Sequence, residues 1–136
     1  ASVALLQLET PLDVVAAAAK QAKALGCMVV LNPAPAVPLP ESLLRNVDVL
    51  IPNESELPIC AGKGTGAEDP LAKLRAMCHV IVTLGSRGCL VGPRGSDAVV
   101  AVPSFTPPGP VLDTTGAGDC FCAAIAVRLA EDASPL

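Results

Sequence analysis

Aromatic residues are nearly absent from this chain of 136 residues, which has two Phe, no Tyr and no Trp. Proteins that bind single-stranded nucleic acid usually stack the bases on aromatic side chains, so this class of function is not indicated. The nine Lys and Arg residues are scattered and the formal net charge is −4, so the sequence has no electrostatic footprint for nucleic acid. We therefore expect no nucleic-acid partner.

Long apolar runs are also missing, because none reaches the roughly 18 residues that a membrane-spanning helix needs. No secretory signal is visible, and we expect no membrane partner. The six cysteines form no C-x-x-C pair and His79 is the one histidine, which argues against a zinc site and against a disulfide framework. Cysteines in mostly apolar stretches favour buried free thiols in a reducing compartment, and we expect a cytoplasmic protein.

Apolar residues make up 51% of the chain, enough to build the core of about one ordinary domain. Short apolar runs bounded by Gly, Pro or polar residues predict four buried strands. These runs lie at residues 3–8, 27–31, 47–51 and 80–84. Because aromatics are scarce, Ala, Val and Leu must fill the interior, which suits close packing of helices on a sheet.

Helices are expected between these strands. Thr10 as a cap and Pro11 as the first helical residue predict the start of an Ala-rich helix that ends near Gly26. Further elements are expected as helices at residues 40–46, 69–78 and 116–131, loops at 53–56 and 62–66, and a hairpin of strands 89–91 and 98–102. The alternation of buried strands and helices predicts one α/β domain over residues 1–136, with a mostly parallel sheet covered by helices.

A polar residue stands at the end of each predicted parallel strand. These residues are Glu9, Asn32, Asn53 (with Glu56) and Thr83. Ligands bind open parallel sheets beyond the carboxyl ends of the strands. Loops are polar in most proteins, so one such residue would carry little weight, but four on one edge predict a cleft there.

The segment from Asp113 to Asp119 reads Asp-Thr-Thr-Gly-Ala-Gly-Asp and opens directly into the last predicted helix. Small residues let backbone N–H groups approach an anion closely, and a helix N-terminus favours negative charge, as in a phosphate. A carboxylate at this place, that of Asp119, can accept the proton of an attacking hydroxyl. The competing interpretation, a helix-cap acid after a glycine turn, explains a shorter string better than this one.

This string, followed by Cys120-Phe121, resembles the C-terminal signature of the ribokinase (carbohydrate kinase) family. Further blocks agree with the family in order and spacing. The family's N-x-x-E motif is matched by Asn53-Glu54-Ser55-Glu56, and its nucleotide-binding turn by Thr83-Leu84-Gly85-Ser86-Arg87-Gly88. Two more blocks resemble ribokinases in particular, Gln7-Leu8-Glu9 and Asn32-Pro33-Ala34-Pro35-Ala36. The resemblance covers nearly the whole chain. It implies a single partial domain with a three-layer α/β/α ribokinase-like fold, incomplete at both ends, since a complete member also has an N-terminal half with a lid and a closing C-terminal segment.

The resemblance implies a kinase that transfers phosphate from ATP to the primary hydroxyl of a sugar. Asp119 would be the catalytic base, in contact with the sugar hydroxyl that it deprotonates. The backbone N–H groups of Gly116, Ala117 and Gly118 would form an anion hole for the phosphoryl group in transfer, with the two glycines also against the nucleotide. Positioning and electrostatics of this kind supply most of the catalysis in phosphoryl transfer.

The resemblance also implies roles for the two motifs at the strand ends. Asn53 and Glu56 would organise Mg²⁺ and its waters, a role that suits an outer-shell carboxylate. Thr83, Gly85 and Gly88 would lie along the nucleotide. A surface turn with a helix cap stays open as the alternative for the first motif, and a plain hairpin turn for the second.

Three further roles follow from the resemblance. Glu9 would contact sugar hydroxyls, and Asp113 with Thr115 would bind a monovalent cation, usually K⁺. For Asn32 a role in stabilising its own loop stays open, and Asp113 has the alternative of an exposed loop acid.

The leading hypothesis is the phosphorylation of D-ribose to ribose 5-phosphate by a protein that is a homodimer at full length. Another sugar or a nucleoside is the alternative substrate within the same class. A non-catalytic, kinase-derived subunit or fragment in a larger assembly is the alternative from another class. A generic dinucleotide-binding domain is not supported, because its glycine signature follows the first strand of a βαβ unit, whereas the glycines here open the last helix.

Overall fold

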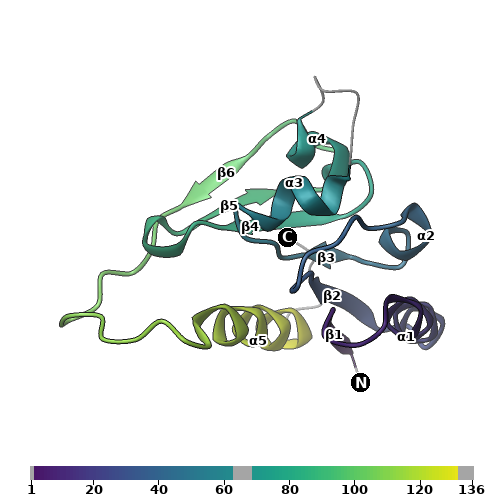
Figure 1. Ribbon diagram of the computed structural model, residues 1–136, viewed down its shortest axis with the longest axis horizontal. Helices are drawn as coiled ribbons and strands as arrows, with labels where there is room; N and C mark the ends of the chain where they lie inside the picture. The colour runs from purple at the N-terminus through teal and green to yellow at the C-terminus, as the bar shows by residue number, and fades with distance from the viewer. Residues whose placement is uncertain (1, 63–68, 132–136) are drawn as a thin grey trace.

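The sheet is mixed and its strands follow one another in space in the order of the sequence. The computed structural model describes residues 2–62 and 69–131. Its strands are β1 (Val3–Gln7), β2 (Met28–Asn32), β3 (Val49–Leu50), β4 (His79–Thr83), β5 (Cys89–Gly92) and β6 (Val100–Val102). The first four are parallel, and the last two form an antiparallel hairpin on β4 (Figure 1). The mostly parallel sheet predicted from the sequence is therefore confirmed.

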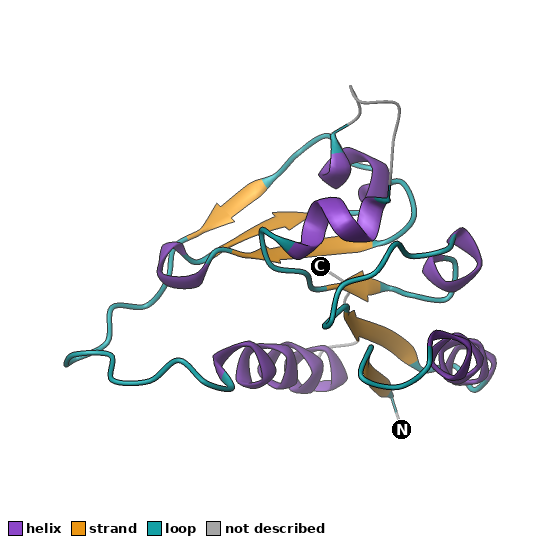
Figure 2. Cartoon of the chain, in the orientation of Figure 1, coloured by secondary structure: helices purple, strands orange, loops and turns teal. Residues whose placement is uncertain are grey.

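Helices cover this sheet on both faces (Figure 2). They are α1 (Leu12–Ala24), α2 (Glu41–Leu44), α3 (Glu56–Ala61), α4 (Pro70–Arg75) and α5 (Ala117–Glu131), with a 3-10 turn, η1 (Gly85–Arg87), after β4. None of the helices in the described residues is both long enough and apolar enough to cross a membrane.

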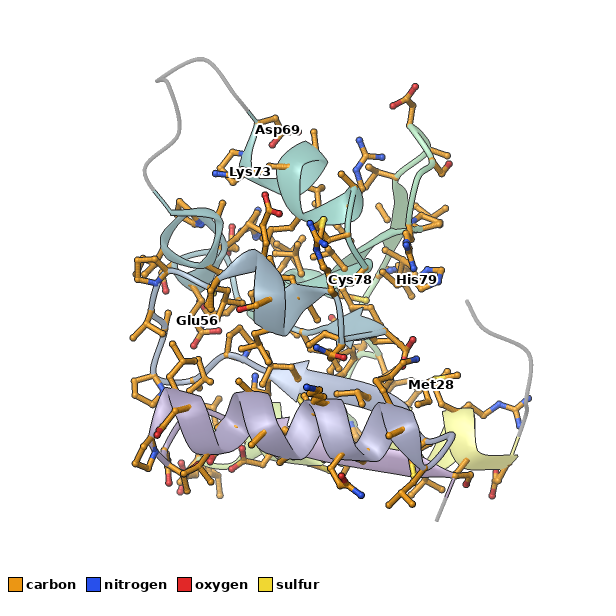
Figure 3. All side chains as sticks on the ribbon, turned by 90° about the vertical axis from the view of Figure 1, so that its right-hand side faces the viewer. Met28, Glu56, Asp69, Lys73, Cys78 and His79 are labelled. Atoms are coloured by element: carbon orange, nitrogen blue, oxygen red, sulfur yellow. The ribbon has the colours of Figure 1, made fainter. Side chains whose placement is uncertain are left out.

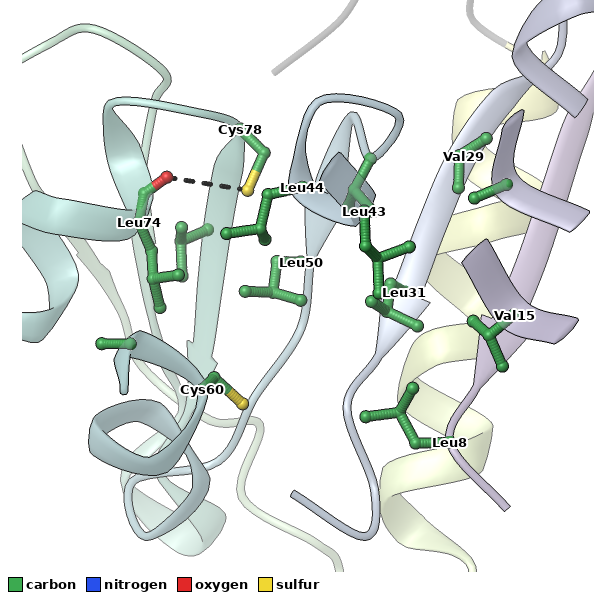
Figure 4. Close-up of a cluster of buried hydrophobic side chains, with 14 of the residues drawn as sticks. Leu8, Val15, Val29, Leu31, Leu43, Leu44, Leu50, Cys60, Leu74 and Cys78 are labelled. Carbon is green, nitrogen blue, oxygen red and sulfur yellow. Dashed lines mark hydrogen bonds between the residues drawn. The ribbon is translucent and has the colours of Figure 1, made fainter. Parts of the chain in front are cut away.

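Side chains of the central strands alternate between two separate cores, because successive residues of a strand point to opposite faces. Val29 and Leu31 of β2 and Leu50 of β3 are fully buried in the first core. That core also receives Val15 from α1 and Leu74 from α4 (Figure 4). Apolar runs without alternation of polar residues are what a sheet covered on both faces requires.

The second core lies beneath α5 on the other face of the sheet. Val30 of β2, Val49 of β3 and Ile81 of β4 pack there, each at most 2% exposed. The facing residues of α5 are Cys122, Ile125 and Leu129, which lie on one side of a helix because they are spaced by three and four positions. The sheet thus has helices on both sides, and the three-layer α/β/α fold is confirmed.

Several local predictions were wrong. The cap of α1 is Pro11 without a side-chain hydrogen bond, so Thr10 does not cap the helix and Pro11 is not its first residue. The predicted loop 53–56 ends in a helix that was missed, because α3 starts at Glu56. Pro58 lies in the first turn of this helix, where a missing N–H costs little.

Other differences are smaller. The helix expected at residues 40–46 has one short turn, and the strand expected at 80–84 begins and ends one residue earlier. Of the predicted Gly-rich turn, Gly62 follows α3 with a φ of 70°, and residues 63–66 lie outside the described residues. None of the six cysteines forms a disulfide and five of them are buried, but Cys120 is exposed, contrary to the expectation of buried thiols.

Candidate active site

A cavity of about 250 Å³ opens at the carboxyl edge of the parallel strands, between the ends of β2, β3 and β4 and the start of α5. It is lined by Asn32, Ala34, Ile51, Asn53, Glu56, Thr83, Gly116, Gly118, Asp119 and Cys122. In Figure 3, Glu56 lies at the opposite edge of the sheet from Cys78 and His79, which precede and begin β4. The cavity therefore occupies the position that open parallel sheets use for ligands.

Asn53 and Glu56 are fixed to one another at the start of α3. Asn53 Oδ1 accepts hydrogen bonds from the backbone N–H groups of Ser55 (3.0 Å) and Glu56 (2.9 Å). In return, the backbone N–H of Asn53 donates to Glu56 Oε2 at 2.8 Å. This is the reciprocal pattern of a capping box. It holds the Glu56 carboxylate at the cavity wall.

The ends of β3 and β4 are joined at the cavity floor. Asn53 and Thr83 form a parallel bridge, and the Thr83 N–H donates to the Pro52 carbonyl at 2.9 Å. The side-chain amide of Asn32 donates to the Ile51 carbonyl at 2.9 Å, which ties the end of β2 to the end of β3. The structure therefore gives Asn32 a loop-stabilising contact, and it also places this residue in the cavity wall.

The turn after β4 depends on its two glycines. Gly85 and Gly88 have φ values of 58° and 92°, in a region that other residues rarely adopt. The backbone N–H of Leu84 donates to the Gly88 carbonyl at 2.8 Å. A Cβ on Gly88 would lie 2.0 Å from the carbonyl oxygen of Val102, so the turn packs directly against the chain that leaves β6. Neither glycine is among the residues that line the cavity.

The N-terminus of α5 presents backbone donors to the cavity. Gly116 has a φ of 74°, the Ala117 N–H donates to the Thr114 carbonyl (3.1 Å), and the Cys120 N–H donates to the Gly116 carbonyl (2.9 Å). The N–H groups of Gly118 and Asp119 lie between these two, in the first turn, where a helix offers no acceptor of its own. Gly116, Gly118 and the exposed Asp119 all line the cavity.

Asp113 and Thr115 form a small loop of their own before α5. Both the N–H and the hydroxyl of Thr115 donate to Asp113 Oδ1, at 2.8 and 2.7 Å. The hydrogen bond from this N–H, helped by the hydroxyl, lowers the pKa of the Asp113 carboxyl below its usual value. The Asp113 carboxylate is therefore ionised at neutral pH, and it lies outside the residues that line the cavity.

Glu9 is the predicted strand-end residue that the structure does not bring to the cavity. It follows β1 at the carboxyl edge and is exposed, but it is not among the lining residues. Ala34, Ile51 and Cys122 line the cavity although no role was assigned to them from the sequence. Helical spacing could have found Cys122, because it lies three residues after Asp119 on the same helix.

The pKa of the Cys122 thiol is affected by charged groups of the cavity. Its pKa is raised to about 11, first by burial and then by the negative charges of Asp119 and Glu56. Both carboxylates, Glu56 on α3 and Asp119 on α5, therefore lie near enough to this thiol to raise its pKa. A thiol with this pKa stays protonated at neutral pH.

The residues present fit a magnesium ion held largely through water and phosphate rather than a closed metal cage. Among residues 2–62 and 69–131, no group of three or more His, Cys, Asp or Glu side chains is placed to hold a metal ion. Mg²⁺ commonly keeps several waters and binds one or two carboxylates together with substrate phosphates. Glu56 at the cavity wall supplies one such carboxylate.

The chain is similar in sequence and in structure to known proteins. Residues 1–135 match the family model described as pfkB family carbohydrate kinase. A ribokinase of Haemophilus influenzae is 38% identical over an alignment 136 positions long, which covers 96% of this chain and 43% of that protein. The structure of Arabidopsis thaliana ribokinase complexed with ribose and ATP is similar with a TM-score of 0.82 and 36% identity, covering 96% of this chain and 44% of that one. Thermotoga maritima ribokinase gives a TM-score of 0.80, 31% identity and the same two coverages. The chain spans less than half the length of these relatives.

Proposed function

Because this chain belongs to the pfkB family of carbohydrate kinases, we propose that the protein transfers the γ-phosphoryl group of ATP to the primary hydroxyl of a sugar. The observation that carries this proposal is the shared cavity. Asp119 at the start of α5 faces the same space as Asn53 and Glu56 after β3 and Thr83 at the end of β4. A base, backbone donors and a carboxylate for the metal are thus gathered where open sheets bind ligands.

We propose D-ribose as the sugar. The support is that the relatives reported above are ribokinases and that the structure of one of them is complexed with ribose and ATP. The blocks around Glu9 and Asn32 resemble ribokinases more than the wider family. Asn32 and Ala34 line the cavity, so they could contact a sugar bound there. Glu9 does not line the cavity, so its side chain would have to extend into the cavity to contact the sugar.

The chain's own groups suggest the course of the transfer. Asp119 accepts the proton of the attacking hydroxyl as the new O–P bond forms. Of the N–H groups expected from the sequence to form the anion hole, that of Ala117 is bonded to the Thr114 carbonyl and Ala117 does not line the cavity. The N–H groups of Gly116 and Gly118, together with that of Asp119, donate to the phosphoryl oxygens, where the positive end of α5 favours negative charge. Asn53 holds Glu56 in the orientation that lets its carboxylate order the waters of Mg²⁺. Bound Mg²⁺ would neutralise charge on the phosphates.

Other parts of the proposal rest mainly on the family. Gly85 and Gly88 would border the nucleotide through the turn that Thr83 leads into. Asp113, ionised through its bonds from Thr115, is suited to a monovalent cation such as K⁺, which would supply a fixed positive charge beside the anion site. We further propose a homodimer in the cytoplasm.

The test is ADP release from ATP by the full-length protein with Mg²⁺, K⁺ and D-ribose. We expect ribose-dependent turnover that Asp119→Asn reduces by a factor of about 10²–10⁴, the usual contribution of a general base. Asp97→Asn is the matched control, because Asp97 is exposed in the β5–β6 loop and does not line the cavity. Turnover with another sugar or a nucleoside would correct the substrate. Absence of turnover with every such acceptor would favour a non-catalytic, kinase-derived subunit.

A further inference from the structure

Two loops at the cavity edge are joined by an ion pair. The guanidinium of Arg87 donates from Nη2 to Glu54 Oε2. Glu54 lies between the end of β3 and the start of α3, and Arg87 is the last residue of η1, 33 positions later. The hydrogen bond and the charge of Glu54 raise the pKa of Arg87 further, so this guanidinium keeps its charge at any physiological pH.

Each partner belongs to a segment with a separate task in the proposed reaction. Glu54 stands between Asn53 and Glu56, the residues proposed to act on the magnesium side. Arg87 stands between Gly85 and Gly88, the residues proposed to border the nucleotide. The ion pair therefore joins the segment proposed for the metal to the segment proposed for the nucleotide.

The backbone alone leaves the tip of the η1 turn weakly attached to the neighbouring loop. The bond from Thr83 to Pro52 joins the two segments only at their base. Beyond it, the backbone hydrogen bonds of the turn are internal, from Arg87 to the Leu84 carbonyl and from Gly88 to the Gly85 carbonyl. The Ser86 carbonyl accepts a hydrogen bond from the Ser104 hydroxyl, which holds the turn to the segment after β6 and not to the loop before α3. Among the described residues, Arg87 to Glu54 is the side-chain hydrogen bond that links the tip of the turn to the loop before α3.

Both side chains are largely exposed, Arg87 to 65% and Glu54 to 53%. Exposed ion pairs contribute little to global stability, so this one is poorly explained by a need to keep the protein folded. The position of the ion pair between two segments of the proposed site suggests another role, because a small displacement between catalytic segments reduces the rate of transfer far more than it reduces stability.

We propose that Arg87 is a positioning residue, which through Glu54 holds the nucleotide turn at a fixed place relative to the Asn53–Glu56 motif. The proposal rests on the function proposed above. Removing the pair lets the turn move away, so that bound MgATP loses contacts on one side while the sugar site is unchanged. We therefore expect the loss of the pair to raise KM for ATP and to leave KM for ribose unchanged.

The test compares four forms of the full-length protein: wild type, Arg87→Glu, Glu54→Arg and the double charge swap. In the single variants two like charges face each other. We expect a rise of about two- to tenfold in KM for ATP, with KM for ribose unchanged, as repulsion between exposed charges allows. The swap restores the attraction and should recover most of the loss. Arg45→Glu, directly after α2, is the matched control, because Arg45 pairs with Glu41 at similar exposure and neither residue lines the cavity.

A second readout separates this inference from the proposed function. Binding of MgATP raises the melting temperature of a protein that binds it, and this shift requires no turnover. We expect a smaller MgATP-induced shift in the single variants, recovery in the swap, and nearly equal melting temperatures without nucleotide. A wild type that shows the shift but no sugar turnover would refute the proposed function alone.

Three outcomes would overturn the inference. A swap no better than Arg87→Glu would mean that Arg87 contacts the nucleotide directly. A lower melting temperature without nucleotide, together with an unchanged KM for ATP, would mean that the pair is merely structural. A wild type without any MgATP-induced shift would show that there is no nucleotide to position.

Discussion

Asn53 and Glu56 cap one another at the start of α3, with the Glu56 carboxylate accepting the Asn53 N–H at 2.8 Å and Asn53 Oδ1 accepting the Glu56 N–H at 2.9 Å. The same carboxylate lines the cavity. One side chain thus serves both the fold and the proposed metal site, and these two roles can be separated by substitution.

The first prediction separates them. Glu56→Gln keeps an oxygen acceptor for the Asn53 N–H, as a capping box allows, but it loses the negative charge. We expect stability to change by less than about 0.5 kcal/mol, whereas the Mg²⁺ concentration for half-maximal activity rises at least about tenfold. Activity titrated with Mg²⁺ and urea unfolding of the same sample give the two values. Asn53→Ala is the counterpart, since it removes the cap and should cost about 1 kcal/mol.

The second prediction concerns Gly88. Gly88→Ala adds a Cβ that would lie 2.0 Å from the Val102 carbonyl oxygen, at a φ of 92°. We expect a loss of at least about 2 kcal/mol in the free energy of unfolding, since backbone strain and a backbone clash combine. Gly95→Ala is the control, because Gly95 also has a positive φ but nothing lies within 4 Å of the added Cβ. Equal losses in the two variants would show that the close approach does not matter.

The third prediction is a loss of stability in alkaline solution. Burial raises the pKa of Cys60 and of Cys78 from 9.0 to about 12. Above pH 9 the unfolded chain releases these protons while the folded chain keeps them, so the unfolded state binds fewer protons and stability falls as the pH rises. We expect full stability below about pH 9 and a progressive loss from there towards pH 12.

Urea unfolding at a series of pH values measures this dependence. The variant Cys60→Ala should start less stable, because it leaves a cavity, but its stability should fall less steeply above pH 9. A slope that is unchanged in this variant would contradict the assignment of the alkaline transition to the buried thiols.

The fourth prediction uses the two cysteines that flank Phe121 on α5. Cys120 is exposed and Cys122 is 3% exposed with a pKa of about 11. Alkylation of the native protein with iodoacetamide at neutral pH should modify Cys120 and spare Cys122, because only the thiolate reacts. MgATP should slow the modification of Cys120, since the neighbouring Asp119 faces the cavity. Peptide mass spectrometry with and without MgATP reads both sites, and rapid labelling of Cys122 would show that α5 does not stay docked.

Much of the fold was predictable from the sequence because the strands are buried on both faces. The apolar run at residues 27–31 predicted β2 to within one residue of its place at Met28–Asn32, and Gly116 predicted the start of α5. The missed helix α3 has a physical cause. Its six residues include Pro58, and the cap formed by Asn53 and Glu56, which the structure shows, was kept from the sequence only as an alternative interpretation.

The candidate site was predictable only in part. Strand ends gather at one edge, so Asn32, Asn53 and Thr83 were expected together, and they do line one cavity. Glu9 was expected with them and is not among the lining residues. Which strand ends α5 faces depends on where the long connection after β6 lets that helix dock, and no local pattern encodes this. The ion pair of Arg87 with Glu54 could not be predicted from the sequence either, because it joins positions 33 residues apart.

The division of the interior into two cores has a consequence for how the site is lost. Glu56 belongs to the layer that packs on the first core, and Asp119 belongs to α5, which packs on the second. Proteins open in cooperative units that often follow such divisions. Release of α5 alone would therefore dismantle the site while the first core keeps its amide protons protected from exchange, so inactivation would precede denaturation.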